Sequence, residues 1–433
     1  MARSAPFISI VVPTRNRPEL LHYCLKSVAL QTLDDFEVIV SDNHTGIPCK
    51  HVVEHMADKR FKYVVPPVPL AMHDSWEFAC SHAIGEYVAV LIDKTILRPS
   101  ALEVVYTTIQ KHPAEIVSWW NESYTPLDQA GSYGQGSYQP CHRPREPFYY
   151  DPRQELERRF RLNVRRGQEG VRYGWGKICF GAYHRDLISR ITGAIGRLFH
   201  PISPDYTSML AALAFTSSAL DVGQPLLISF MTNVSTGGLA AQRDEFVIAI
   251  LRDLDPSLRI LSSAPLQGLY ASTHNLVARD YAFMQELVGA PMGHLKLNKR
   301  NLILRAREDL DQRRSWQDGS RRTEQYQVWT TYFSQLALTD RIRVRLELIK
   351  FRCLPISRWR HLLVVKLGKL FPRMTESMRT YYRRYIPGSA MEAKVFDSII
   401  SAARYADDCA QRGRRERKRA SKSRREAAVL HKR

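Results

Sequence analysis

The feature that most limits how this chain can fold is the alternation of short β-branched runs with amphipathic helices over residues 7–119. The first run, Phe7–Asn16, ends in a proline turn and leads into a helix whose apolar residues recur at helical spacing. Later runs of the same kind lie at 36–40, 61–65, 87–92 and 116–119. Strands that alternate with helices predict an α/β fold with a mainly parallel sheet flanked by helices.

Polar residues follow these predicted strands at the points where the strands end. Thr14-Arg15-Asn16 follows the first strand, Asp42 the second and Asp93 the fourth. Small polar ligands bind beyond the carboxyl ends of the strands in sheets of this type. We therefore expect a ligand site at this edge of the sheet. The later stretch 121–150, rich in Gly, Ser, Tyr and Pro, predicts a long surface loop over the site or a hinge between subdomains.

Positive charge is concentrated at one end of the chain. Of the formal net charge of +20, residues 341–433 carry 26 Lys or Arg against 8 Asp or Glu, which leaves 37 against 35 for residues 1–340. The uneven charge therefore divides the chain into a nearly neutral part, residues 1–340, which is expected to bind a small ligand, and a basic appendage, residues 341–433.

Cellular location is indicated by three observations. No apolar run approaches the roughly 20 residues that span a bilayer, and the first residues do not resemble a secretion signal. The seven cysteines have neither metal-binding nor redox spacing. We therefore expect a cytoplasmic protein with reduced thiols.

The ordered segments of the first 120 residues resemble a known family, the nucleotide-sugar-dependent glycosyltransferases of family 2, which have the GT-A fold. The resemblance rests on Ser9–Asn16, Leu25–Val28, Gln31-Thr32, Phe36–Asn43, Ala83–Val88, Leu91–Asp93 and Pro99, and it extends more loosely to about residue 238. It implies a GT-A-like domain over 1–240 and a hexosyltransferase-like activity. Helical periodicity then predicts a helical extension over 241–352.

The resemblance also implies which residues hold the nucleotide of the sugar donor. They are Pro13, Thr14, Arg15, Asn16, Asp42 and Asp93. A carboxylate suits ribose because it accepts hydrogen bonds from vicinal hydroxyls. Alternative roles remain open: Asp42 as a turn residue beside Asn43, and Arg15 as a solvated loop residue.

The acidic motif after the fourth strand departs from the family pattern. Similar sequences carry several carboxylates here, whereas this chain reads Asp93-Lys94-Thr95. A Mg²⁺ or Mn²⁺ ion at Asp93 is therefore doubtful, since such ions usually take more than one protein or substrate ligand. In one hypothesis, Lys94 replaces the cation against the donor diphosphate. In the other, the site is catalytically silent and the domain is a sugar-nucleotide-binding scaffold.

Two further carboxylates are candidates for the sugar and the acceptor. Asp74 begins a predicted helix before the fourth strand, where it would contact the donor sugar or cap the helix. Asp205 occupies a Pro-Asp-Tyr segment, and an inverting transferase needs one base there to take a proton from the acceptor hydroxyl. Its alternative role is to complement the helix dipole.

The last segment, 353–433, mixes cations with aromatic and aliphatic residues and ends in a dense basic tail at 412–425. Such a segment suits an anionic membrane surface. Nucleic acid is the rival partner, and a solvated tail is the third alternative. The sequence therefore predicts an inverting glycosyltransferase with a glycan or lipid-linked acceptor, peripheral on the cytoplasmic face of a membrane. The alternatives are a silent scaffold and a basic nucleic-acid-associated protein.

Overall fold

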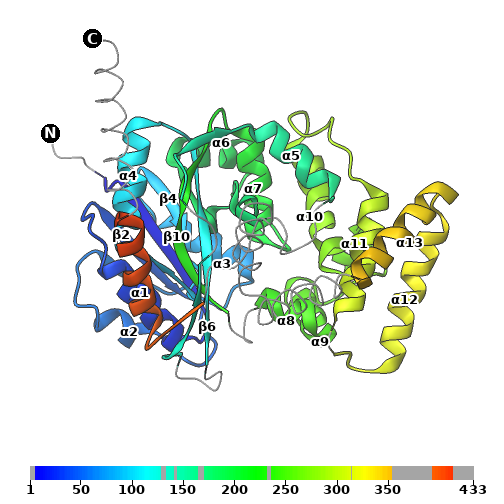
Figure 1. Cartoon of the computed structure of the whole chain (residues 1–433), viewed down its shortest axis with the longest axis horizontal. Helices are drawn as coiled ribbons and strands as arrows, with labels where there is room; N and C mark the ends of the chain where they lie inside the picture. Colours follow the sequence, from blue (N-terminus) through cyan, green and yellow to red (C-terminus); the bar gives the residue numbers. More distant parts are fainter. Residues whose placement is uncertain are drawn as a thin grey trace, which may run out of the picture.

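The computed structural model describes residues 5–127, 133–140, 144–163, 170–231, 236–313, 315–353 and 393–412. Figure 1 shows a twisted sheet with helices on both of its faces and a group of helices beyond one face. The strands are β1 Ile8–Thr14, β2 Phe36–Asp42, β3 Phe61–Val64, β4 Tyr87–Val90, β5 Thr95–Leu97, β6 Ile116–Pro126, β7 Gly136–Gln139, β8 Phe148–Tyr150, β9 Gly181–His184, β10 Ala219–Phe230 and β11 Lys394–Phe396.

The helices follow the predicted alternation in the first part of the chain and dominate its later part. They are α1 Pro18–Ala29, α2 Lys50–Glu54, α3 Met72–Ser81, α4 Ala101–Lys111, α5 Pro152–Arg161, α6 Arg185–Ile195, α7 Pro204–Phe215, α8 Thr236–Gln242, α9 Asp244–Leu254, α10 Thr273–Val288, α11 Lys299–Gln312, α12 Gly319–Ser334, α13 Leu338–Cys353 and a helix at 399–412. Short 3₁₀ turns lie at η1 Gly170–Gly174, η2 Ile178–Phe180 and η3 Arg259–Ser263. Among the described residues, no helix has the length and apolar content needed to cross a membrane.

The sheet runs in the order β11-β7-β6-β9-β4-β1-β2-β3, with β10 paired to β5, β6 and β8. Strands β4, β1, β2 and β3 are parallel neighbours, and β6 is parallel to β10. The predicted α/β fold with a mainly parallel sheet is confirmed. The fifth predicted strand is not adjacent to β4, however, because the antiparallel β9 lies between β4 and β6.

The core is divided by the sheet because successive side chains of a strand point to opposite faces. In β1, Ile10 and Val12 pack with α1, α2 and α4, whereas Val11 belongs to the larger cluster on the other face. That larger cluster includes α3, α6 and α7 and continues into α10–α13.

The prediction of a long surface loop over 121–150 is wrong for much of its length. Strand β6 continues to Pro126, and β7 and β8 follow within the same stretch. Tyr124 and Tyr138 are buried and face each other across the β6–β7 pair. Tyrosine favours strands, and its large ring fills the core. The remaining parts of this stretch, 128–132 and 141–143, lie outside the described residues.

Residues 393–412, within the predicted basic segment 353–433, pack against the sheet. Strand β11 pairs with β7, and the helix at 399–412, red in Figure 1, buries Ile399 and Ala403 against Leu20 and Phe230. The rest of the segment, 354–392 and 413–433, is outside the described residues.

A buried polar cluster fixes this helix beside α4. Arg98 forms an ion pair with Glu122 and donates to the Ala406 carbonyl (3.4 Å), while Ser100 Oγ donates to Asp407 Oδ1 (2.5 Å). Breaking such a buried network costs more than losing a surface pair, because it leaves an uncompensated charge.

Candidate active site

Three strand ends meet at the predicted site. In the parallel β1–β2 pair, Thr14 lies opposite Asp42. The Thr14 hydroxyl donates to Asp93 Oδ2 at 3.0 Å, just beyond the end of β4. Thr14 therefore links the ends of β1, β2 and β4, and the expected convergence is present in the structure.

Asp42 is fully buried and is held on one side only. Its Oδ2 accepts hydrogen bonds from the Cys49 amide and the Tyr63 hydroxyl, both at 2.7 Å. Its Oδ1 is buried without a hydrogen-bond partner among the described residues. Asp42, the last residue of β2, thus holds the following loop from the strand end and does not lie in a turn with Asn43. Most buried polar atoms have partners, so the exception at Oδ1 needs an explanation.

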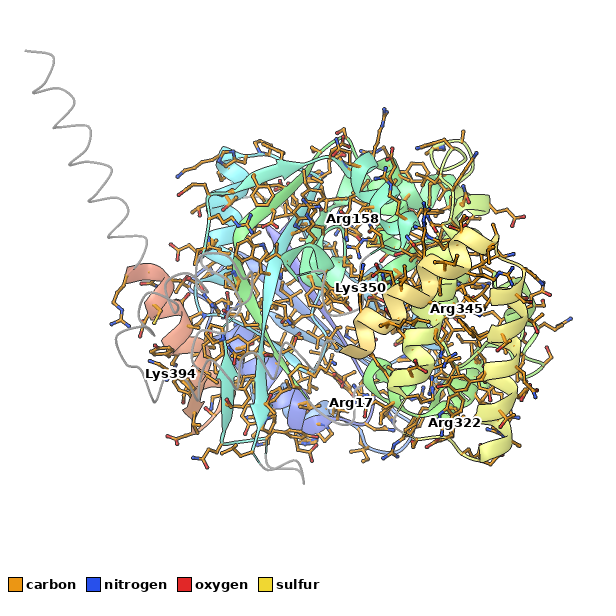
Figure 2. The ribbon with its side chains drawn as sticks, turned by 45° about the vertical axis from the view of Figure 1, so that its right-hand side comes forward. Arg17, Arg158, Arg322, Arg345, Lys350 and Lys394 are labelled. Atoms are coloured by element: carbon orange, nitrogen blue, oxygen red, sulfur yellow. The ribbon has the colours of Figure 1, made fainter. Side chains whose placement is uncertain are left out.

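Asp93 pairs with an arginine that the sequence analysis did not select. Arg17 Nη1 lies 3.4 Å from Asp93 Oδ1, and Arg17 immediately precedes α1 (Figure 2). Burial raises the pKa of Asp93, while Arg17, Thr14 and Lys94 oppose that rise. The sequence indicates a role for Arg17 only weakly, as a second arginine in Thr14–Arg17 directly before a helix.

Asp93, the doubtful metal ligand, is already contacted by two protein side chains. Its two oxygens already face the Thr14 hydroxyl and the Arg17 guanidinium, which brings positive charge to the position that a metal ion would take. Within the described ranges, no group of three His, Cys, Asp or Glu side chains could hold a metal ion.

The other residues of the first loop have separate contacts. Pro13 lies inside β1 opposite Ser41. Arg15 is half-exposed, with Nη1 3.8 Å from Asp253 Oδ2 of α9. Asn16 has a φ of +56° and binds Thr45 through its side-chain amide, with Nδ2 2.7 Å from Thr45 Oγ1. The Asn16 side chain therefore holds the loop that follows β2. Arg15 instead contacts α9 of the helical extension.

Asp205 lies at the start of α7 beside a buried lysine. Lys177 Nζ donates to Asp205 Oδ2 at 3.0 Å and lies 4.0 Å and 3.5 Å from the ring centroids of Tyr173 and Tyr206. Burial alone lowers the pKa of Lys177, but Asp205 and the tyrosines raise it, and the net pKa is well above the ordinary value. The side chain of Asp205 remains about one-quarter exposed at 25 %, so solvent or substrate can reach it.

Lys94 and Asp205 both lie near Cys179. Burial raises the pKa of the Cys179 thiol; Asp205 adds to the rise and Lys94 opposes it. Lys94 is half-buried in the turn that follows β4. The charges of Lys94 and Asp205 therefore both act on the Cys179 thiol.

Comparison with known proteins identifies the family of the first part of the chain. Residues 9–176 match the family model described as glycosyl transferase family 2. These residues form a family 2 glycosyltransferase domain. Asp205 and Lys177 lie just beyond the matched residues.

Curated relatives of the glycosyltransferase domain are similar over short stretches. A GalNAc(5)-diNAcBac-PP-undecaprenol beta-1,3-glucosyltransferase of Campylobacter jejuni is 33 % identical over 103 residues, which cover 23 % of this chain and 33 % of the relative. A validoxylamine A glucosyltransferase of Streptomyces hygroscopicus is 45 % identical over 62 residues, or 14 % of this chain and 15 % of the relative. The chain thus spans a third or less of these relatives. The crystal structure of S. aureus TarS 1-349 in complex with UDP-GlcNAc aligns with a TM-score of 0.43 at 14 % identity, covering 76 % of this chain and 93 % of that one.

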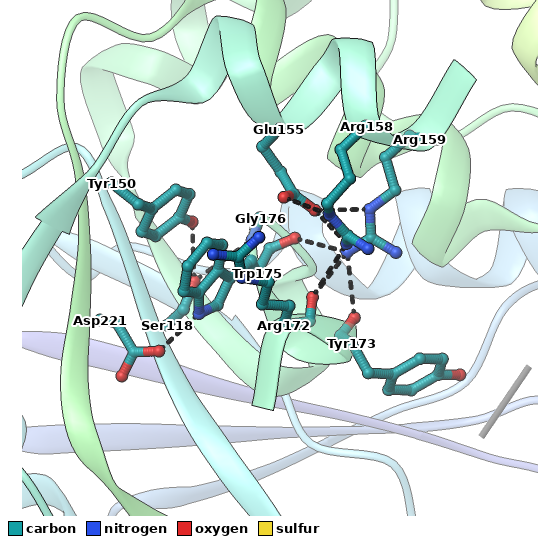
Figure 3. A network of polar contacts seen from close by, with 10 residues as sticks. All are labelled: Ser118, Tyr150, Glu155, Arg158, Arg159, Arg172, Tyr173, Trp175, Gly176 and Asp221. Carbon is teal, nitrogen blue, oxygen red and sulfur yellow. Dashed lines mark hydrogen bonds and ion pairs between the residues drawn. The ribbon is translucent and has the colours of Figure 1, made fainter. Parts of the chain in front are cut away.

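A polar network at the end of the glycosyltransferase domain positions the chain that leads to Lys177 (Figure 3). Arg159 is buried against Glu155, with Nε 2.8 Å from Glu155 Oε1. Its Nη2 donates to the carbonyls of Arg172, Tyr173 and Trp175 at 2.8, 3.3 and 3.3 Å. One guanidinium thereby binds three backbone carbonyls within and just after η1, since Arg presents several donors in a rigid plane.

Trp175 is anchored from the other side of this network. Its indole Nε1 donates to Asp221 Oδ2 at 2.5 Å, and its ring stacks on Tyr150 with a centroid distance of 4.4 Å. Burial raises the pKa of Asp221, and the indole donors of Trp120 and Trp175 oppose that rise. The short turn between Trp175 and Lys177 is therefore held at both ends.

Asp74, the candidate contact for the donor sugar, forms an ion pair with an arginine of a neighbouring loop. Arg197 Nη2 donates to Asp74 Oδ1 at 2.6 Å. The N-cap of α3 is Ala71, so the capping role considered for Asp74 is wrong. Trp76 is buried against Phe199, with ring centroids 5.5 Å apart, as a core residue should be.

The loop before α7 contains a buried histidine that makes folding sensitive to pH. Burial, together with the charges of Arg197, His73 and Arg279, lowers the pKa of His200 to about 4. Its Nε2 has no partner among the described residues. The folded state therefore keeps His200 neutral where the unfolded state takes up a proton.

We expect the free energy of unfolding to fall as the pH drops from about 6.5 toward 4, because only the unfolded state gains the proton in this window. His200→Gln should remove about 2 kcal/mol of the difference in stability between pH 7 and pH 5. Urea unfolding at the two pH values measures it, with the exposed His51→Gln as the control. Equal pH dependence in wild type and His200→Gln would contradict this assignment.

Proposed function

We propose that this chain transfers a sugar from a nucleoside diphosphate sugar to an acceptor hydroxyl, with inversion at the anomeric carbon. The observation that carries the proposal is the meeting of Thr14, Asp42 and Asp93 at the strand ends of a family 2 glycosyltransferase domain. Ligand sites of parallel α/β sheets occur at such strand ends. The UDP-GlcNAc complex of TarS agrees with a nucleotide-sugar donor but is too distant to identify the base.

Asp42 is proposed to receive the nucleoside. Its unpartnered Oδ1 can accept a hydrogen bond from a ribose hydroxyl or from the base. Pro13, Thr14 and Asn16 would shape the backbone around the nucleotide, and Arg15 would close over it from the side of α9. A bound ligand would remove the cost of leaving a buried carboxylate oxygen without a donor.

Two cations are proposed to stabilise the departing diphosphate. Lys94 lies after β4, and Arg17 lies at Asp93. As the bond between the anomeric carbon and the diphosphate oxygen breaks, negative charge develops on that oxygen. Fixed cations in a partly buried site stabilise such charge effectively. In this proposal, Arg17 and Lys94 supply the positive charge that a divalent cation would otherwise supply.

Asp205 is proposed as the base. It would take the proton of the acceptor hydroxyl as the acceptor oxygen forms its bond to the anomeric carbon from the face opposite the leaving diphosphate. Lys177 holds one carboxylate oxygen and so fixes the direction of the other. The half-buried ring of Tyr206 lies beside the base and is covered on one face by the Lys177 ammonium, 3.5 Å from the ring centroid.

Partners beyond the donor are also proposed. The acceptor is a glycan or a lipid-linked saccharide, and the basic segment 353–433 holds the enzyme at an anionic membrane surface on the cytoplasmic side. In support, one relative is named for an acceptor linked to PP-undecaprenol. Net positive charge near a lipid surface contributes about 1 kcal/mol per residue.

Asp205→Asn should lower kcat by at least about 10³-fold, because the amide cannot take the acceptor proton. Binding of the donor should be unchanged, since the proposal gives Asp205 a role toward the acceptor and not toward the nucleotide. Product formation and donor binding by calorimetry measure the two effects separately. Asp186→Asn, on the exposed start of α6, is the control. Retained turnover in Asp205→Asn would refute the role as base.

Lys94→Ala should lower kcat by about 10²-fold, because one cation is lost from the developing diphosphate charge. EDTA should leave the wild-type rate unchanged. The exposed Lys111→Ala, at the end of α4, is the control. Inhibition by EDTA that added Mn²⁺ reverses would contradict cation replacement, and so would full activity of Lys94→Ala. Absence of any turnover together with tight donor binding would favour the scaffold.

A further inference from the structure

The outer face of α13 carries an apolar stripe that nothing in the described structure covers. Four large aliphatic side chains on this helix are between 47 % and 64 % exposed: Leu338, Ile342, Leu346 and Ile349. They are spaced by four, four and three residues, which places them on one side of an α-helix. Single exposed aliphatic residues are ordinary, but a row of four along one helix face marks an interaction surface.

The stripe is not the face by which α13 joins the protein. Val344 and Leu348 are buried and belong to the core cluster shared with α11. In Figure 1, α13 and α12 lie at the edge of the molecule farthest from the sheet. The stripe therefore faces outward from a helix that is already anchored on its other side.

Cations border the stripe on both sides. At 100° per residue, Arg345 lies on one side of the stripe, and Arg343 and Lys350 lie on the other. All three are exposed, and Figure 2 labels Arg345 and Lys350 on α13. Each side chain also has a contact: Arg343 with Asp340 (3.8 Å), Lys350 with Glu347 (2.7 Å), and Arg345 with the Phe333 ring (5.5 Å).

The acidic residues of α13 are on the opposite half of the helix. Asp340 and Glu347 lie about 140° or more around the helix from the middle of the stripe. Asp340 also lies 3.5 Å from Arg300 of α11. The exposed stripe thus presents aliphatic side chains bordered by positive charge, while the two acidic side chains lie on another side of the helix.

We propose that the outer face of α13 docks on an anionic lipid bilayer, with the helix lying in the plane of the interface. Helices with an apolar face edged by Lys and Arg bind in this way: the apolar side chains enter the boundary of the acyl chains and the cations meet lipid phosphates. The proposal extends membrane association from the basic tail to a folded surface. It does not depend on glycosyl transfer, so each can fail without the other.

A second copy of the chain is a poorer occupant of the same face. A symmetric pairing of two α13 stripes would bring Arg343, Arg345 and Lys350 close to their own copies, with the acidic residues turned away. Four aliphatic side chains also provide much less area than the roughly 1,200–2,000 Å² of a stable interface. Charge complementarity therefore favours a lipid surface.

The test is co-sedimentation of the full chain with vesicles of phosphatidylglycerol and phosphatidylcholine, compared with vesicles of phosphatidylcholine alone. The double variant Ile342→Gln/Ile349→Gln keeps helix propensity and charge but removes half of the stripe. We expect its binding to anionic vesicles to weaken about tenfold or more. The control is Ile84→Gln, since Ile84 is 52 % exposed outside α13.

Two further measurements make the outcome decisive. Arg343→Gln/Arg345→Gln should weaken binding about tenfold at low salt and little at high salt. Hydrogen exchange should slow at residues 338–350 when anionic vesicles are added, and circular dichroism checks that every variant is folded. Wild-type binding by the isoleucine variant would overturn the proposal and assign binding to the tail. A dimer without lipid that the isoleucine variant dissociates would overturn it in favour of a second copy.

Discussion

The hydroxyl of Thr14 is the contact on which the proposed site depends. The register of the β1–β2 pair sets Thr14 opposite Asp42, and its hydrogen bond reaches Asp93 beyond β4. Parallel strands end at one edge of a sheet, but only such a cross-strand contact brings polar groups from three of them within reach of one ligand. The apolar side chains of β1 pack on both faces of the sheet, so the edge is rigid.

Two partly buried pairs of opposite charge are proposed to supply the chemistry of the site. Arg17 faces Asp93, and Lys177 faces Asp205. Burying an ion pair costs desolvation energy that is only partly returned by attraction, so such pairs are weak evidence for stability alone. Perturbed ionisable groups in a recess more often belong to functional sites. In this account, Arg17 offsets the charge of a nucleoside diphosphate, and Lys177 orients the base.

The sequence could predict the strands of the parallel half and their convergent ends, because local apolar patterns and the rule for parallel sheets were enough. It could not predict β9, a short strand whose partners in β4 and β6 are distant in the chain. The loop predicted over 121–150 was wrong because Gly and Pro were weighted above the strand preference of buried Tyr124 and Tyr138. Tertiary packing overrode the local signal there.

The proposed site was predictable only where its residues sit at strand ends. Asp42 and Asp93 followed from that position, whereas Arg17 and Lys177 are partners that only the fold brings to them. A weak signal for Lys177 was present, since a lone lysine within the apolar run from Trp175 to Phe180 requires a compensating charge. For Asp74, the local pattern suggested a cap, but Arg197, which is distant in the sequence, determines its contact.

The most direct test of the central claim is the thermal stability of the full chain with UDP or GDP. A ligand that prefers the folded state stabilises it by about 2.7 kcal/mol at a concentration one hundred times its Kd. The account predicts that one of the two nucleotides raises the melting temperature, and that Arg17→Gln reduces the rise while the exposed Arg161→Gln does not. No rise with either nucleotide, or an equal rise in both variants, would contradict a nucleotide site at the ends of β1, β2 and β4.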